Sequence, residues 1–138
     1  IKALQQWWKM NKANTFDEFY EILKIDRKNS DFSRKRDLFD LHEHLAGEVE
    51  ELKQALDNDD GHNVMEELGD VFWNTLMMMI MAEEKYDFTG KDVIEDSLAK
   101  IRRRKDHIFD ENNGLSREEE LDKWKKVKVK EKNGEFNE

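Results

Sequence analysis

Cysteine and proline are absent from this chain of 138 residues, which also holds only six glycines. Without cysteine there is no disulfide framework, no thiolate metal site and no cysteine nucleophile. The residues that form the turns of a β-sandwich or barrel are equally scarce. With 41% charged and 37% hydrophobic residues, the composition instead favours long helices joined by polar turns, in a chain the size of one domain.

The charge of the chain is negative, with 33 acidic against 24 basic residues and a net charge of −9. Such a balance argues against a general nucleic-acid or anionic-membrane surface. The opening segment, IKALQQWWKM, lacks the basic and apolar regions of a secretory signal. The longest apolar stretch, Val71–Ala82, is too short to span a bilayer. We therefore expect a cytoplasmic protein with no nucleic-acid or membrane partner.

Hydrophobic periodicity and capping residues predict an all-α fold, an antiparallel helical bundle with short loops. Thr15 with Glu18, and Ser116 with Glu119, form capping-box pairs that predict the starts of two helices. The first of these helices is expected to end near Ile25. The other predicted helical segments are 1–12, 38–56, 64–85 and 91–108, and residues 26–37 are expected to form a polar connection.

Two acidic residues interrupt the apolar face of the segment 38–56. At 100° per residue its leucines form one stripe, with Glu48 inside the stripe and Glu51 at its edge. A carboxylate that points into the core of a bundle is costly unless it is paired or neutralised. The position of these two acids therefore points to a ligand or a partner.

The next predicted helix has the same feature, because Glu67, Asp70 and Asn74 share one face with its methionines. Side chains three residues apart on a helix lie about 5–6 Å from each other, so the two acids of each helix are close enough to share an ion. Inward carboxylates raise one another's pKa, and a hard cation, Mg²⁺ or Mn²⁺, removes the conflict. Two alternatives stay open: the acids pair with lysines, or they lie on a solvated face.

Two other kinds of metal site do not fit the sequence. If Gly61 takes the turn position of a calcium-binding loop, Leu56 falls where the first acidic ligand must be. A di-iron bundle needs Glu-x-x-His pairs, and no histidine of this chain has a glutamate three residues before it.

A basic cluster lies near the end of the segment 91–108. Lys100, Arg103 and Arg104 lie on neighbouring faces about one turn apart. Cations at the C-terminus of a helix interact favourably with the helix dipole, and this effect alone accounts for their position. The alternative is that they bind phosphates held by the metal site.

These features resemble the MazG-type nucleoside triphosphate pyrophosphohydrolases of the all-α superfamily. That family carries an E-E-x-x-E motif followed by E-x-x-D. The corresponding segments here read GEVEEL and EELGD, with 15 residues between Glu51 and Glu67, and Gly47 replaces the first acid of the doublet. The resemblance implies that the metal ligands are Glu48, Glu51, Glu67 and Asp70.

The resemblance extends beyond the acids. KIRRRKDHIF is similar to the family's K-L-x-R-R-H-P-H-V-F, which implies phosphate-binding roles for Lys100, Arg103 and Arg104. The tail WKKVKVKEK is similar to W-x-x-I-K-x-x-E-K. Phe32 stands at the tryptophan of the family's C-P-W-D segment, and it either stacks on a nucleobase or packs as a plug. Asn74 either hydrogen-bonds phosphate or sugar or is a satisfied core amide.

The activity that this resemblance implies is Mg²⁺-dependent hydrolysis of a nucleoside or deoxynucleoside triphosphate to the monophosphate and pyrophosphate, as in cleaning of the nucleotide pool. Glu48 or Glu51 would double as the general base. The alternatives are a dUTP/dCTP-selective hydrolase, a phosphoribosyl-ATP pyrophosphohydrolase, and a non-catalytic module that binds nucleotides or mediates oligomerisation.

The segment 64–85 also bears on assembly, because it is apolar nearly all round. In so small a domain, such a helix favours burial by a second copy, and we expect a homodimer or a homotetramer. Trp73 and the run Met77–Met81 are expected in the core or at this interface. The expected organisation is an N-terminal helical extension at 1–30, a MazG-like helical domain at 31–132 and a frayed tail at 133–138.

Overall fold

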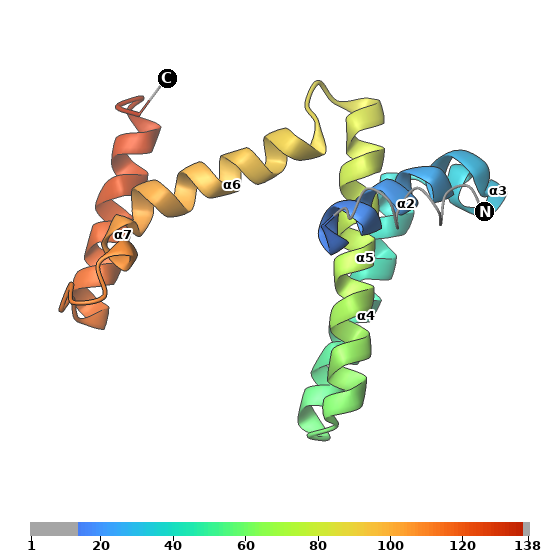
Figure 1. Ribbon diagram of the computed structural model, residues 1–138, viewed down its shortest axis with the longest axis horizontal. Helices are drawn as coiled ribbons and strands as arrows, with labels where there is room; N and C mark the ends of the chain where they lie inside the picture. Colours follow the sequence, from blue (N-terminus) through green and yellow to red (C-terminus); the bar gives the residue numbers. More distant parts are fainter. Residues whose placement is uncertain (1–13, 137–138) are drawn as a thin grey trace. The chain divides into compact units, whose positions relative to one another are not determined.

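The computed structural model describes residues 14–136, and every regular element in this range is helical (Figure 1). The predicted all-α fold is thereby confirmed; the segment 1–12 lies outside the described residues. The described part divides into two compact units, one ending at Gly90 and one beginning at Lys91. The helices are α2 (Thr15–Asn29), α3 (Asp31–Arg34), α4 (Leu38–Asp57), α5 (Gly61–Lys85), α6 (Gly90–Arg104) and α7 (Arg117–Lys132), with a 3₁₀ turn, η1 (Asp106–Phe109), after α6.

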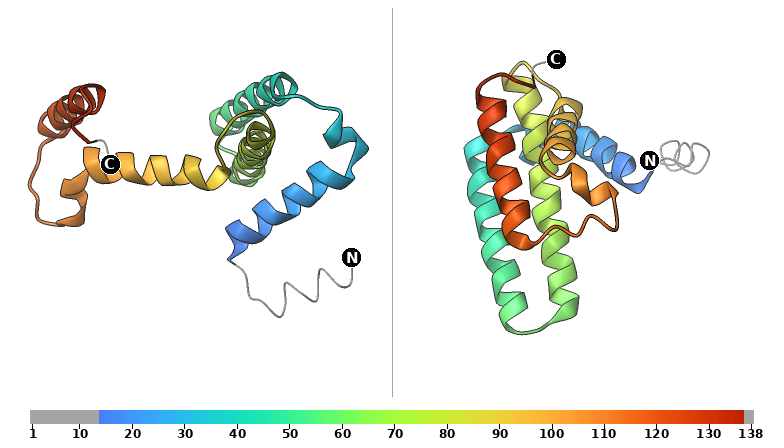
Figure 2. Two further views of the ribbon diagram at one scale, coloured as in Figure 1. Left: turned by 90° about the horizontal axis from the view of Figure 1, so that it is seen from above. Right: turned by 90° about the vertical axis from the view of Figure 1, so that its left-hand side faces the viewer.

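In the first unit, α4 and α5 form a long antiparallel hairpin, and α2 crosses α5 (Figures 1 and 2). Asp37 and Asp40 form a reciprocal capping box at the start of α4. Asp60 caps α5 by accepting a hydrogen bond from the Asn63 backbone amide. At the other end of α4, the backbone amide of Asn58 donates to the carbonyls of Gln54 and Leu56. Hydrogen bonds thus close both ends of the three-residue connection between α4 and α5, and this turn fixes which residues of the two helices face each other.

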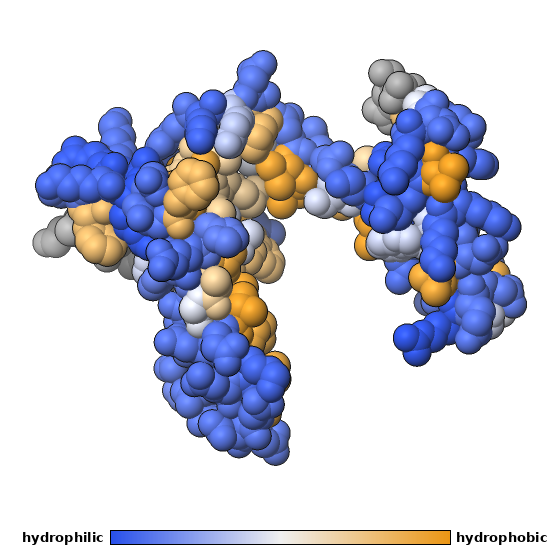
Figure 3. All heavy atoms as spheres, turned by 180° about the vertical axis from the view of Figure 1, so that it is seen from behind, coloured by the Kyte–Doolittle hydropathy of each residue, from blue (hydrophilic) through white to orange (hydrophobic). Residues whose placement is uncertain are grey.

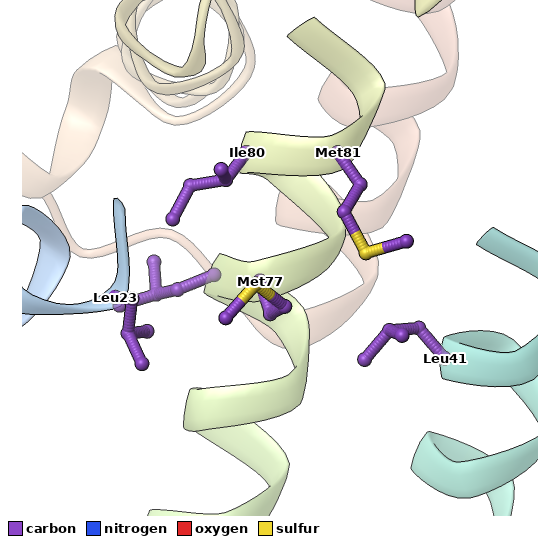
Figure 4. Close-up of a cluster of buried hydrophobic side chains, with 6 residues drawn as sticks. Leu23, Leu41, Met77, Ile80 and Met81 are labelled. Atoms are coloured by element: carbon purple, nitrogen blue, oxygen red, sulfur yellow. The ribbon is translucent and has the colours of Figure 1, made fainter. Parts of the chain in front are cut away.

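The core of this unit lies where α2 meets the hairpin. Leu23 of α2 and Leu41 of α4 are almost fully buried, on either side of Met77 (Figure 4). Leu76, Ile80 and Met81 of α5 complete the cluster. The half of the hairpin nearer the turn buries little apolar surface of its own, and apolar side chains gather along one of its edges (Figure 3).

The second unit is held together mainly by charged contacts. Arg104 and Arg103 of α6 both hydrogen-bond Glu131 of α7, and Lys123 contacts Asp106. Within the described residues of this unit only one side chain, that of the histidine in η1, is buried. The pairing of α6 with α7 therefore rests on ion pairs more than on an apolar core.

Several helix boundaries differ from the prediction. Helix α2 is capped by Asn14, whose side chain accepts a hydrogen bond from the Phe16 amide, so Thr15 is its first residue and not its cap. This helix continues to Asn29, and the expected polar connection contains the short helix α3. Helix α5 begins at Gly61 because its cap is the preceding aspartate.

The fourth predicted helix is shorter than expected. Helix α6 ends at Arg104, because Lys105 leaves helical geometry with φ −131° and ψ 38°, and η1 replaces the last predicted turn. The predicted cap at Ser116 is present, as its hydroxyl accepts a hydrogen bond from the Glu119 amide. Among the helices of residues 14–136, none has the length and apolar character needed to cross a membrane.

Candidate functional site

Three carboxylates come together between the two helices of the hairpin. Glu48 comes from α4, and Glu67 and Asp70 come from successive turns of α5. One oxygen of each lies within 4.8 Å of the others. Glu48 and Asp70 are equally far along the chain from Asp59 in the turn, so an antiparallel hairpin places them opposite each other. The structure thus brings together three of the four acids that the sequence singled out.

These carboxylates are poorly solvated. The Glu48 side chain is only 13% exposed, and the Oε2 atoms of Glu48 and Glu67 are buried without a hydrogen-bond partner among the described residues. Burial raises the pKa of Glu48 from 4.5 to about 7, and the Glu67 and Glu51 carboxyl groups add to this shift. Burial also raises the pKa of Glu67.

The remaining acid, Glu51, lies outside the group of three. It is an exposed residue one turn along α4 from Glu48. Its carboxyl group nevertheless contributes to the raised pKa of both Glu48 and Glu67, so it faces the cluster. Glu51 therefore lies next to the group of three, on the solvent-exposed side of that group.

No lysine or arginine of residues 14–136 forms an ion pair with any of these four acids. The basic group within 4.0 Å of these acids in that range is His44, whose Nε2 lies 3.2 Å from Oε1 of Glu48. The alternative that the acids pair with lysines therefore does not apply within this range. Buried carboxylate oxygens that lack donors and crowd one another form a donor set that suits a hard divalent cation.

A cavity of about 270 Å³ borders the cluster, and both Glu48 and Asp70 line it. Aromatic walls come from Phe32, the second residue of α3, and from Trp73 of α5. Phe32 is 74% exposed and Trp73 48% exposed, so neither is buried in the core. For Phe32 this speaks against the plug interpretation, and for Trp73 it excludes the core.

Asn74 lines the same cavity but is itself buried. Its Nδ2 donates a hydrogen bond of 2.7 Å to the backbone carbonyl of Asp70, one turn earlier on α5. One donor of the amide is therefore used within its own helix, as expected for a satisfied core amide. Its position on the wall keeps the ligand-binding interpretation open to test.

Helix α3, which carries Phe32 to the cavity, is held by one arginine. Arg27 of α2 makes two hydrogen bonds of 2.9 Å to Glu84 of α5. Its Nη1 also donates to the backbone carbonyls of Ser33 and Arg36. A buried or half-buried arginine that spans three segments fixes their relative positions.

The basic residues singled out by the sequence belong to the second unit, where each has an acidic partner. Lys100 pairs with Asp96 at 2.9 Å, one turn earlier on α6. Arg103 and Arg104 both bind Glu131, at 3.2 and 2.8 Å. Their predicted contact with metal-bound phosphate stays a prediction.

Sequence reasoning missed several residues that the cavity brings together. Asp26 and Arg36 fell in a segment expected to be a connection, and His44 has no ligand spacing to another histidine. Their approach to the acids depends on how α2 and α3 pack on the hairpin. A signal in the sequence was the opposite charge of Asp26 and Arg36 on either side of Phe32.

Comparison with known proteins gives a consistent family assignment. The sequence model of one protein family, the MazG nucleotide pyrophosphohydrolase domain, matches residues 36–109, which include all four acids and the basic cluster of α6. The uncharacterized protein YabN of Bacillus subtilis is 31% identical over 120 residues, covering 86% of this chain and 24% of YabN. A nucleoside triphosphate pyrophosphohydrolase/pyrophosphatase MazG of Thermotoga maritima is 31% identical over 119 residues, covering 85% of this chain and 45% of that protein.

A solved structure supports the same assignment. The crystal structure of a MazG-related protein from Thermotoga maritima superposes with a TM-score of 0.76 at 29% sequence identity, over 82% of this chain and 98% of that one. The chain spans less than half the length of the two curated relatives described above. The family match covers more than half of the present chain, and the protein therefore belongs to the MazG nucleotide pyrophosphohydrolase family.

Proposed function

We propose that this protein hydrolyses a nucleoside or deoxynucleoside triphosphate to the monophosphate and pyrophosphate with the help of Mg²⁺, for which Mn²⁺ can substitute. The observation that carries the proposal is the carboxylate cluster of Glu48, Glu67 and Asp70, with two buried oxygens that have no partner among the described residues. It lies beside a cavity with aromatic walls. The names of the family and of the Thermotoga maritima relative support the reaction type.

The acids would hold the cation between α4 and α5. A bound Mg²⁺ would neutralise phosphate charge and acidify a water molecule for in-line attack. Of the two candidate bases, Glu51 is the better placed to accept the proton of that water, because its carboxylate lies outside the group of three and is exposed. Glu48 is the alternative base.

The substrate's organic part would occupy the cavity. Phe32 and Trp73 offer aromatic faces to a nucleobase, and Asn74 offers its side-chain oxygen to the sugar or phosphate. Lys100, Arg103 and Arg104 would stabilise charge on the leaving pyrophosphate after exchanging their acidic partners for phosphate oxygens. A homodimer or homotetramer is the proposed assembly.

The direct test is pyrophosphate release from the eight common NTPs and dNTPs, with Mg²⁺, with Mn²⁺ and with EDTA. We expect release that requires the metal, and loss of turnover by at least about 100-fold in Glu67→Gln and Asp70→Asn. The matched control is Glu66→Gln, because Glu66 is the exposed neighbour on the same helix and pairs only with His62 among the described residues. Full turnover in both site variants would contradict the proposed metal site.

The same experiment separates the alternatives. Release from dUTP or dCTP alone would favour a pyrimidine-selective hydrolase, and phosphoribosyl-ATP can be added as a ninth substrate. If Mg²⁺ and nucleotide bind but no pyrophosphate is released, the non-catalytic binding module is the better description.

A further inference from the structure

The cavity beside the carboxylates contains two charged groups that the reaction does not use. Asp26, near the C-terminal end of α2, and Arg36, just after α3, both line it. The Asp26 carboxylate makes no hydrogen bond or ion pair with any residue from 14 to 136. The Arg36 guanidinium likewise has no acidic partner in that range, and its contact there is with the Phe32 ring, 5.3 Å from the ring centroid.

Two charged residues close to them in the sequence, by contrast, are in ion pairs. Arg27 is paired with Glu84, and Asp31 is paired with both Arg34 and Lys35. Asp26 and Arg36 line one cavity, yet they do not form an ion pair with each other. An acid and a base that share an aromatic cavity without bonding each other are both available to a ligand.

A nucleobase that satisfies both groups is limited by its hydrogen-bonding pattern. An arginine binds two neighbouring acceptors with its fork of N–H donors, as it does at O6 and N7 of guanine. A carboxylate binds two neighbouring donors, and guanine presents them at N1 and N2. Adenine, cytosine and uracil each lack a pair of adjacent donors. Guanine is therefore the common base that offers a complete partner to both an arginine and an aspartate.

We propose that Asp26 and Arg36 make this cavity selective for guanine nucleotides, with Asp26 accepting from N1–H and N2–H and Arg36 donating to O6 and N7. The base would stack on Phe32 in place of the Arg36 guanidinium, which lies over that ring without the ligand and would move to the edge of the base to donate. Since Glu48 and Asp70 line the same cavity, a base in it has its phosphates beside the carboxylate cluster. This assignment rests on the proposed function for the identity of the ligand class.

Binding of nucleoside monophosphates tests the assignment without requiring turnover. Dissociation constants of GMP, IMP, AMP, CMP and UMP are measured by titration calorimetry with Mg²⁺, for the full chain and for Asp26→Asn and Arg36→Gln. The matched controls are Asp31→Asn and Arg34→Gln. These two residues form an exposed pair on the adjacent helix α3, and neither lines this cavity. Circular dichroism checks that every variant keeps its helical content.

We expect GMP to bind at least about tenfold more tightly than AMP, CMP or UMP, since a bidentate contact discriminates by roughly 5- to 150-fold. IMP lacks the 2-amino group and should fall between GMP and AMP. Asp26→Asn should abolish the difference between GMP and IMP, whereas Arg36→Gln should weaken both. The two control variants should bind all five ligands as the unchanged chain does.

Equal binding of all five monophosphates, or a preference for another base, would overturn the guanine assignment. So would a guanine preference that survives both Asp26→Asn and Arg36→Gln. Pyrophosphate release from all triphosphates without a base preference would leave the hydrolase intact and overturn this inference alone. GMP-selective binding that depends on Asp26, with no release from GTP or dGTP, would support the guanine assignment and contradict the proposed hydrolysis.

Discussion

At the scale of single residues, Glu48 makes the stability of the metal-free protein depend on pH. Its pKa is raised to about 7, first by burial and then by its acidic neighbours. The unfolded chain has the ordinary value of 4.5, so the folded state binds the extra proton between pH 4.5 and pH 7. Stability of the metal-free protein should therefore fall as the pH rises through this window.

The substitution Glu48→Gln removes that dependence. At pH 8 and in EDTA we expect the variant to be more stable than the unchanged chain by about 1–3 kcal/mol, and near pH 5 the difference should vanish. Urea unfolding at a series of pH values measures this. Glu50→Gln, an exposed acid of the same helix, is the control. Added Mg²⁺ should stabilise the unchanged chain and not Glu48→Gln; the opposite order would speak against the cluster as a cation site.

Two glycines offer a second test at this scale. A Cβ added to Gly90 would clash with the Tyr20 hydroxyl, which donates to Glu83 at 2.6 Å. The Gly90 amide donates to the same carboxylate oxygen, so the methyl group would displace a shared bond. We expect Gly90→Ala to cost about 1–3 kcal/mol. Gly47→Ala, with open space in mid-helix, should stabilise by about 0.5–1 kcal/mol; equal effects in thermal unfolding would contradict this.

The carboxylate cluster could be predicted from the sequence, and the cavity could not. Glu48 breaks an apolar stripe and Glu67 lies three residues before Asp70, so local periodicity is enough to place them inward. Trp73 reads as a core residue from its helix alone. In the structure α2 covers only part of Trp73. Phe19 of α2 packs edge-on against it, with ring centroids 6.0 Å apart, and Trp73 remains 48% exposed. Such contacts between distant segments are invisible to periodicity.

At the scale of elements, caps predict where helices begin better than periodicity predicts where they end. Ser116 marks the start of α7, and Asp60 marks that of α5, where the apolar pattern begins only at Val64. Apolar pattern alone continues α6 through Ile108, but the chain departs from the helix at Lys105. The departure lets His107 turn inward and bond Glu120 of α7 at 2.6 Å, a tertiary reason that no local signal carries.

The contact of α6 with α7 depends on Glu131. Hydrogen bonds from Arg104, and then from Arg103, lower the pKa of Glu131 to about 2 from its ordinary 4.5. Its contribution to stability is therefore complete above pH 4.5 and is lost as the pH falls toward 2. We expect Glu131→Gln to loosen the second unit at neutral pH and to behave like the unchanged chain near pH 2.

Hydrogen exchange resolves this effect by element. In Glu131→Gln the amides of α6 and α7 should exchange about tenfold faster at neutral pH, while those of α4 and α5 stay unchanged. Asp122→Asn is the control, because Asp122 pairs with Lys126 in an exposed i, i+4 contact on the same helix, which contributes little. Faster exchange across the whole chain would contradict a role confined to the second unit.

At the scale of the whole molecule, one face of α5 is left partly exposed by the other described residues of the first unit. Met65 and Leu68 lie three residues apart and are exposed on the side of α5 opposite Glu67 and Asp70, and Phe72, next on that side, is 38% exposed beside the Phe16 and Phe19 rings of α2. The sequence predicts this helix to be buried on nearly all sides, and a single copy of the described residues leaves that burial incomplete. An apolar stripe along a helix that also carries the candidate ligands is typical of a surface covered by a second copy.

The substitution Met65→Glu tests whether this stripe carries the assembly. The unchanged chain should scatter light as a dimer or tetramer of 16.6 kDa subunits at micromolar concentration, and Met65→Glu should shift it toward the monomer, since a carboxylate in an apolar interface loses its solvation. Val129→Glu is the control: Val129 is 58% exposed, close to the 63% of Met65, but it lies on α7 in the second unit. A monomeric unchanged chain would overturn the predicted assembly.

A Val129→Glu variant that dissociates as readily as Met65→Glu would place the interface elsewhere. Because Met65 points away from the carboxylates, a monomer that still binds Mg²⁺ would show that the cation site is complete within one hairpin.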